Sequence, residues 1–123
     1  MAERKILIVD DEEDVRLFLG DFLGDRDFRV EMAESGEEAL EKIAKVQPDL
    51  VLLDVMMPGM DGIQCLEQIK QKYAKVHVIM ITALKDETRM AKAKKLGARD
   101  YIVKPFSLSY LESELGKFLK EIQ

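Results

Sequence analysis

The sequence predicts an α/β fold, in which a doubly wound parallel sheet is built from five strand–helix, or (βα)5, units. Two observations predict it. Short apolar runs alternate with amphipathic stretches along all 123 residues, as expected for strands that helices cover on both faces. In addition, aspartates directly follow two of these runs, where buried strands should end. No linker, repeat or low-complexity tract interrupts the pattern, so residues 1–123 are expected to form a single domain.

The strands are predicted at the apolar runs, which are short and rich in isoleucine, valine and leucine. These runs are residues 6–9, 28–33, 50–53, 76–81 and 101–103. An amphipathic stretch follows each run, so consecutive strands should be parallel and joined by right-handed crossovers.

The helices are predicted where apolar residues recur at a spacing of three or four. They cover about residues 12–24, the stretch between Ser35 and Pro48, a stretch bearing Ile63, Leu66 and Ile69, residues 86–96 and residues 107–122. Ser35 and Glu38 form a capping box at the start of the second helix. Pro58 and Gly59 mark a loop before the third helix.

The composition argues against several classes of partner. The formal net charge is −5, which disfavours a general attraction to nucleic acid or to anionic membranes. No apolar stretch approaches the roughly 20 residues that a membrane helix needs. The first residues lead into a strand without a signal-peptide core, so we expect a cytoplasmic location. The single cysteine, Cys65, cannot form an internal disulfide and fits a buried thiol on a helix.

Polar residues that can carry chemistry stand at the ends of four predicted strands. These residues are Asp10 and Asp11, Asp54, Thr82 and Lys104. Parallel strands bring their carboxyl ends to one edge of a sheet, where open α/β folds bind ligands. Carboxylates gathered there would repel one another without a cation, and hard oxygen ligands with an open side suit Mg²⁺. A carboxylate beside a metal ion and a lysine suits phosphoryl transfer.

Five motifs occur in an order that is informative as a whole. They are Ile-Leu-Ile-Val-Asp10-Asp11, Leu-Leu-Asp54-Val-Met-Met-Pro58-Gly59-Met-Asp61-Gly62, Ile-Thr82-Ala83, Gly97-Ala98-Arg-Asp100-Tyr101 and Lys104-Pro105-Phe106. Through these motifs the chain resembles the response-regulator receiver domain of two-component signalling, the CheY-like family, over essentially its whole length. The resemblance implies the flavodoxin-like strand order 2-1-3-4-5.

The resemblance implies that Asp54 is the phosphoacceptor. It would take a phosphoryl group from a histidine kinase or a phosphotransfer protein and form an acyl phosphate. Lys104 would pair with the phosphoryl oxygens, and Thr82 would donate its hydroxyl to one of them. Such a protein is a signalling phosphoacceptor rather than an enzyme, since it catalyses only its own phosphorylation and slow autodephosphorylation.

The resemblance also implies Mg²⁺ as the cofactor. The ligands would be Asp10, Asp11, Asp54 and the backbone carbonyl of Met56. Asp11 would coordinate directly and Asp10 through water. The ion would neutralise charge on the transferring phosphoryl group and hold it in line for attack.

A conformational switch is implied at three positions. Phosphate would draw Thr82 inward and leave a space that Tyr101 fills, while a cis peptide at Lys104-Pro105 would aim the lysine into the site. We hypothesise that the output surface spans the fourth helix, the fifth strand and the fifth helix. It includes Lys92, Lys95, Arg99, Tyr101 and Tyr110. It would act on a downstream protein or on an output domain that is missing from this sequence.

Each site residue taken alone has a structural explanation. Asp11 could be the N-cap of the first helix, Asp54 a turn residue and Lys104 a solvated surface charge, while Thr82 could be an ordinary strand residue. Two other functions stay open. One is a degenerate receiver that binds protein partners without phosphate. The other is a Mg²⁺-dependent phosphohydrolase, although Met56 stands where such enzymes place a second acid. The sequence also leaves open whether the chain acts alone or is an excised domain.

Other side chains are predicted to have no part in the site. The seven methionines are expected in the core, and His77 is expected to be exposed. The core is also expected to contain Phe18, Phe22, Phe28 and Phe118.

Apolar residues stand two positions beyond the phosphoacceptor and the threonine, at Met56 and Leu84, and they predict slow loss of the phosphoryl group.

Overall fold

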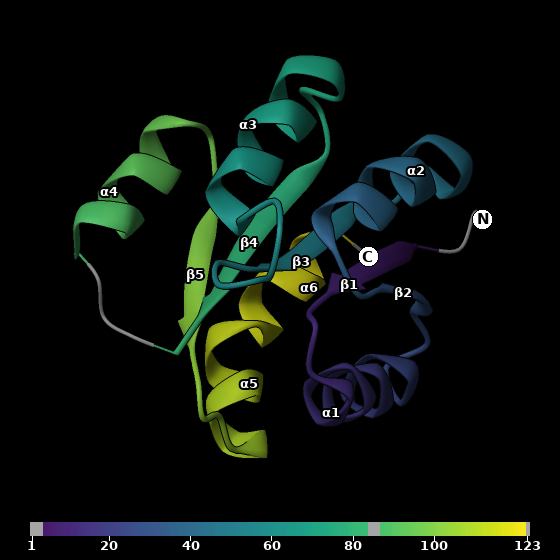
Figure 1. Cartoon of the computed structure of the whole chain (residues 1–123). Helices are drawn as coiled ribbons and strands as arrows, with labels where there is room; N and C mark the ends of the chain where they lie inside the picture. Colours follow the sequence, from purple (N-terminus) through teal and green to yellow (C-terminus); the bar gives the residue numbers. More distant parts are fainter. Residues whose placement is uncertain (1–3, 84–86, 123) are drawn as a thin grey trace.

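Five parallel strands form one sheet in the order β2-β1-β3-β4-β5. This confirms the predicted α/β fold and strand order. The computed structural model describes residues 4–83 and 87–122, and Figure 1 shows helices on both faces of the sheet. The strands are β1 (Lys5–Val9), β2 (Arg29–Ala33), β3 (Leu50–Asp54), β4 (His77–Thr82) and β5 (Asp100–Val103). The helices are α1 (Glu13–Gly24), α2 (Gly36–Val46), α3 (Gly62–Lys72), α4 (Glu87–Lys95), α5 (Leu108–Glu114) and α6 (Gly116–Ile122).

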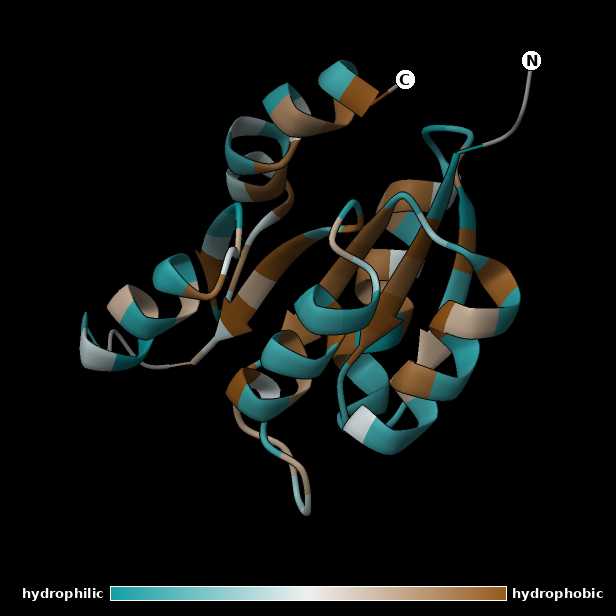
Figure 2. Cartoon of the chain, turned by 90° about the horizontal axis from the view of Figure 1, so that it is seen from above, coloured by the Kyte–Doolittle hydropathy of each residue, from teal (hydrophilic) through white to brown (hydrophobic). Residues whose placement is uncertain are grey.

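The core consists of two apolar layers, one on each face of the sheet. Alternate residues of β1 enter different layers: Leu7 and Val9 pack with α2 and α3, while Ile6 and Ile8 pack with α1, α5 and α6. All four side chains are fully buried. Figure 2 shows the same division, with strongly hydrophobic strands enclosed by helices whose outer faces are largely hydrophilic.

The last predicted helix, residues 107–122, is divided into α5 and α6, which corrects the prediction of one continuous helix. The hydrogen bonds of the backbone nevertheless cross the break. Leu115 N–H donates to Leu111 O at 2.8 Å, and Leu119 N–H donates to Leu115 O at 2.9 Å. The break falls beside Gly116, and glycine is a weak helix former that tolerates a change of direction.

Three predictions about the core were wrong. His77 is half-buried rather than exposed, because its ring packs edge-on against Phe118 at 5.3 Å. Phe18 is 39% exposed, and its ring stacks on Phe106 at 5.9 Å instead of entering the core. Met56 is 53% exposed. The predictions for Phe22, Phe28, Phe118 and Cys65 were correct, since all four are buried.

The sheet has two open edges, at β2 and β5. On β2 the ammonium of Lys42, from α2, donates a hydrogen bond to the carbonyl of Met32. Arg29 and Glu31 form an ion pair along the same strand at 3.8 Å.

The described part of the chain contains no helix that is long and apolar enough to cross a membrane.

Candidate functional site

The polar residues predicted from the strand ends gather at one edge of the sheet. Asp54 is the last residue of β3 and pairs with Ile81 of β4, whereas Thr82 ends β4 and pairs with Val103 of β5. Asp10 follows β1 directly. Asp10, Asp54 and Thr82 are 0%, 3% and 4% exposed. Since buried polar side chains are rare without a partner or a function, this cluster marks the candidate site.

The ammonium of Lys104 lies among three carboxylates. Its Nζ is 2.8 Å from Asp10 Oδ2, 3.1 Å from Glu12 Oε1 and 3.5 Å from Asp54 Oδ2. The lysine side chain is only 12% exposed. The peptide bond between Lys104 and Pro105 is cis, as predicted. A single cation is therefore shared by three acids from two separate parts of the chain, the loop after β1 and the end of β3.

The two buried aspartates are satisfied unequally. Asp10 Oδ1 accepts the backbone N–H of Glu12 at 2.8 Å. Asp10 Oδ2 has no hydrogen bond of good geometry with the described residues and only faces the Lys104 ammonium. Asp54 Oδ1 accepts the backbone N–H of Met56 at 3.3 Å. Each aspartate thus has one oxygen held by the backbone and one directed at the lysine.

Asp54 is a carboxyl group in an environment that disfavours its charge. Burial raises the pKa of Asp54 to about 7, and the neighbouring charge of Asp10 adds to the increase. The Lys104 ammonium and the Met56 N–H oppose the increase. Burial would lower the pKa of Lys104, but the close contact of its ammonium with Asp10 and the negative charge of Asp54 outweigh burial and raise it. The site therefore carries more negative charge than one lysine neutralises.

The donors at this edge fit a hard divalent cation. Carboxylate oxygens of Asp10, Asp11 and Glu12 can lie within 4.8 Å of one another. Asp11 and Glu12 are exposed, whereas Asp10 is buried. Oxygen donors with an open side are the ligands that Mg²⁺ prefers. Asp10 Oδ2 is buried, accepts no hydrogen bond from the described residues and contacts only the Lys104 ammonium, so it can serve as one such donor.

The loop after β3 is held close to the site. Val55 N–H donates to Ile81 O at 2.8 Å, and Gly62 N–H donates to Val55 O at 2.9 Å. A Cβ on Gly62 would lie 2.1 Å from the backbone oxygen of Asp54, so only glycine permits this approach. The exposed Met56 side chain is contacted through its sulfur by Arg89 Nη1 at 2.7 Å. These contacts fix the backbone on either side of the phosphoacceptor candidate.

Comparison with known proteins identifies the family. The model of the response regulator receiver domain matches residues 6–115. The chain belongs to this family. CheY-like receivers share its fold, and receivers are phosphoacceptor proteins of two-component signalling.

Three curated relatives illustrate the similarity. The chain is 42% identical over 120 residues to the chemotaxis protein CheY of Bacillus subtilis, and the match covers 97% of the chain and 99% of that protein. Sporulation initiation phosphotransferase F of the same organism is 36% identical over 119 residues, with 97% and 96% covered. The transcriptional regulatory protein ResD, also of Bacillus subtilis, is 45% identical over 105 residues, 85% of the chain but only 43% of ResD. The chain thus spans less than half of that regulator.

Solved structures agree with this assignment. The chemotaxis protein CheY4 of Vibrio cholerae superposes with a TM-score of 0.88 at 31% identity, covering 94% of the chain and 98% of CheY4. A CheY from Borrelia burgdorferi, solved as a CheX-CheY-BeF3-Mg complex, superposes with a TM-score of 0.88 at 33% identity. The match covers 94% of the chain and 89% of that CheY.

Two residues of this receiver's site were missed from the sequence. Glu12 is the N-cap residue of α1, the place proposed for Asp11, yet its side chain contacts Lys104 instead of capping the helix. Arg16 is buried, and its Nη1 donates to Asp10 O at 2.8 Å while Nη2 contacts Glu34 at 3.2 Å. In the sequence, Arg16 stands three residues before Leu19 and so falls on the apolar face of α1. A charged residue on a buried helix face was the sequence signal that could have indicated a role for Arg16.

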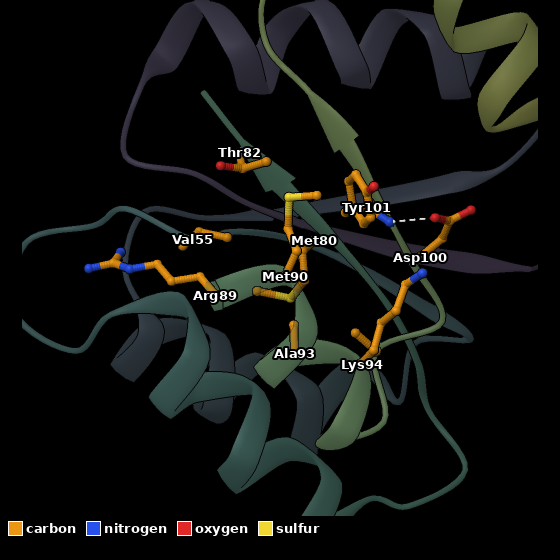
Figure 3. A pocket seen from close by; sticks show the side chains of 10 residues that line it. Val55, Met80, Thr82, Arg89, Met90, Ala93, Lys94, Asp100 and Tyr101 are labelled. Atoms are coloured by element: carbon orange, nitrogen blue, oxygen red, sulfur yellow. Dashed lines mark hydrogen bonds between the residues drawn. The ribbon is translucent and has the colours of Figure 1, made fainter. Parts of the chain in front are cut away.

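A small cavity lies beneath the receiver's candidate switch residue, Tyr101, which is half-buried. The volume is about 10 Å³, roughly the room for one water molecule. Figure 3 shows Met80 and Met90 among the lining side chains near Thr82 and Tyr101. In this conformation the cavity is therefore too small to hold the tyrosine ring. Leu84, predicted to affect phosphoryl loss, lies outside the described residues.

Proposed function

We propose that this receiver accepts a phosphoryl group on Asp54 from the phosphohistidine of a histidine kinase or of a phosphotransfer protein. The observation that carries the proposal is the placement of Lys104 Nζ, 2.8 Å from Asp10 and 3.5 Å from Asp54. A cation held there can neutralise charge on phosphoryl oxygens that arrive beside the Asp54 carboxylate. Asp54 is the nucleophile, and its carboxylate oxygen forms the bond to phosphorus.

Asp10 and Asp11, two acids of the carboxylate cluster at this edge, would hold Mg²⁺ together with Asp54 and the backbone carbonyl of Met56. When bound, Mg²⁺ supplies positive charge that stabilises the transferring phosphoryl group. Asp10 also orients Lys104, and Thr82 donates its hydroxyl to a phosphoryl oxygen. The exposed, apolar Met56 side chain cannot orient an attacking water, which supports slow loss of the phosphoryl group.

Phosphorylation then changes the surface formed by α4, β5 and α5, through Thr82 and Tyr101, and so changes binding to a downstream protein or an output domain. Exposed basic residues of this surface are available to such a partner. They are Lys92, Lys95 and Arg99.

The test is the intact mass after incubation with acetyl phosphate, with and without Mg²⁺. We expect a gain of one phosphoryl group that requires Mg²⁺ and disappears in Asp54→Asn. A folded protein that binds Mg²⁺ but gains no mass would instead support a receiver that acts on partners without phosphate. The decay of the added mass measures the lifetime, and decay within seconds would contradict the slow loss predicted from Met56.

A further inference from the structure

Glu12 occupies a position from which it can control access to Lys104. Its backbone is fixed, because Glu12 N–H donates to Asp10 Oδ1 at 2.8 Å. Its carboxylate makes no capping hydrogen bond to α1, although Glu12 is the N-cap residue. The carboxylate instead accepts a hydrogen bond from Lys104 Nζ at 3.1 Å. Glutamate is not among the side chains that usually cap helices, so the Glu12 carboxylate is available to the lysine.

Among the described residues that contact Lys104, Glu12 is the outermost. Its side chain is 63% exposed, against 0% for Asp10 and 4% for Asp54. Glu12 and Lys104 also line a surface hollow of about 440 Å³, together with Asp14 and Phe18. A phosphoryl donor that approaches Lys104 through this hollow meets the Glu12 carboxylate before it reaches the buried acids.

We propose that Glu12 is a positioning and specificity-determining residue for phosphoryl transfer. It holds the Lys104 ammonium before the donor arrives, and its charge disfavours donors whose leaving group lacks a positive charge. A donor whose leaving group carries an ammonium is not disfavoured, because that group is attracted to the carboxylate. The inference rests on the proposed function, since it concerns transfer to Asp54.

Two small donors separate these effects because they deliver the same phosphoryl group. With acetyl phosphate, an Asp54 oxygen bonds to phosphorus, the bond from phosphorus to the acetyl oxygen breaks, and acetate leaves with the electron pair. With phosphoramidate, the phosphorus–nitrogen bond breaks and ammonia leaves with the electron pair, its nitrogen being protonated beforehand. Nothing is oxidised or reduced in either reaction. Near neutral pH the first donor is a dianion and the second a monoanion with a positive leaving group.

The experiment compares the full chain with Glu12→Gln, Glu12→Asp and Glu13→Gln at saturating Mg²⁺, using both donors and intact mass over time. Glu13 is an exposed acid in the first turn of α1, so its variant removes the same charge nearby. We expect Glu12→Gln to raise the ratio of the acetyl phosphate rate to the phosphoramidate rate about threefold or more. Glu13→Gln should leave this ratio unchanged, and Glu12→Asp should remain closer to the native value than Glu12→Gln.

Several results would overturn the proposal. One is an unchanged ratio in Glu12→Gln, and another is the same shift in Glu13→Gln. A third is a loss of Mg²⁺ affinity in Glu12→Gln, measured by calorimetry, with no change in the ratio, since Glu12 would then belong to the metal site. If neither donor phosphorylates the native chain, the proposed function fails and takes this inference with it. A phosphorylated native chain with an unchanged ratio overturns this inference alone.

Discussion

At the scale of single residues, the site places one lysine beside a cluster of acids, and burial disfavours the charged form of these acids. Asp54 illustrates the conflict. Its pKa is raised from 3.8 to about 7, first because burial disfavours the charge and second because Asp10 is close. A carboxylate that is unstable in the resting protein gains from any added cation. The chemistry proposed for the site and its effect on stability therefore have the same origin.

The first prediction concerns the stability of Asp54→Asn without Mg²⁺. The folded pKa of about 7 exceeds the unfolded value of 3.8, so between these pH values the folded protein retains a proton that the unfolded chain has released. The free energy of unfolding of the native chain should therefore fall as the pH rises through this range. Asp54→Asn removes the charge. Above pH 7 its free energy of unfolding should therefore exceed that of the native chain by on the order of 2–4 kcal/mol.

Urea unfolding of both proteins at a series of pH values measures this difference. The gap should be smallest near pH 4 and should grow until about pH 7. A gap that is independent of pH would show that ionisation of Asp54 is not its cause.

The second prediction concerns Lys104→Met. Methionine keeps much of the apolar stem but removes the ammonium that lies between Asp10 and Asp54. The rate of phosphorylation by acetyl phosphate should fall by an amount that corresponds to about 2–4 kcal/mol of transition-state stabilisation. Lys92→Met is a matched control, because Lys92 is exposed on α4. Equal rates in the two variants would remove Lys104 from the mechanism.

At the scale of elements, the start of α3 lies unusually close to the end of β3. A Cβ on Gly62 would lie 2.1 Å from Asp54 O and 2.7 Å from Val55 Cα. Both of these are backbone atoms, so no side chain can move aside to make room. The approach of the helix to the strand thus determines where the Asp54 backbone lies.

The third prediction follows from this contact. Gly62→Ala should destabilise the fold by about 3 kcal/mol, because the strand and helix must separate. Gly116→Ala is the control, since nothing lies within 4 Å of its added methyl group. That variant should be neutral or stabilise the chain by up to about 1 kcal/mol through higher helix propensity between α5 and α6. Thermal unfolding measures both effects. If Gly62→Ala loses only a little stability, α3 must be able to shift away from β3 easily.

The fourth prediction concerns α4 and Tyr101. The cavity beside the tyrosine ring is about 10 Å³ and is lined by Met80 and Met90, so the ring cannot enter unless a methionine moves. Met90→Ala should enlarge the space and make Tyr101 less accessible to a quencher, even without phosphorylation. Fluorine NMR of fluorinated tyrosine measures this accessibility through the effect of the quencher on the Tyr101 signal. Met56→Ala is the control, because the Met56 side chain is exposed. Unchanged accessibility would limit Met90 to a packing role.

At the scale of the whole molecule, the fold and the site edge could be predicted because they depend on patterns along the chain. Apolar runs ended by Asp54 and Thr82 determined both the strands and their polar ends. Contacts between distant segments could not be predicted in this way. The stacking of Phe18 on Phe106 and the burial of His77 against Phe118 depend on how helices meet the sheet. The apolar patterns of α1 and β4 carry no information about these partners.

The position of Glu12 shows the same limit within the site. The sequence offered Asp11 as the N-cap of the first helix, but the backbone places Glu12 at that position. Its side chain turns to Lys104, which is 92 residues away in the sequence. Only the parallel sheet order, which brings the ends of distant strands together, makes that contact available.

The fifth prediction concerns the response of the entire fold to Mg²⁺. An ion that binds only the folded state should add about 2.7 kcal/mol to the free energy of unfolding at 100 times its dissociation constant. Asp11→Ala should lose this gain, because Asp11 is an acid of the candidate metal cluster. Asp100→Asn, an exposed acid at the start of β5, should keep it. Calorimetric melting with and without the ion measures the gain, and full retention in Asp11→Ala would contradict the assignment.

The contact between Lys42 and the carbonyl of Met32 has a consequence for the behaviour of the protein in solution. Strand β2 is an open edge, and an open edge can accept a strand from another molecule. Here a charged side chain already occupies an outward carbonyl, and an incoming strand would have to displace it and desolvate its ammonium. The ion pair of Arg29 and Glu31 adds further charge to the same edge. Charge far from the candidate site should therefore oppose aggregation through β-sheet growth and keep crowded copies of the receiver apart.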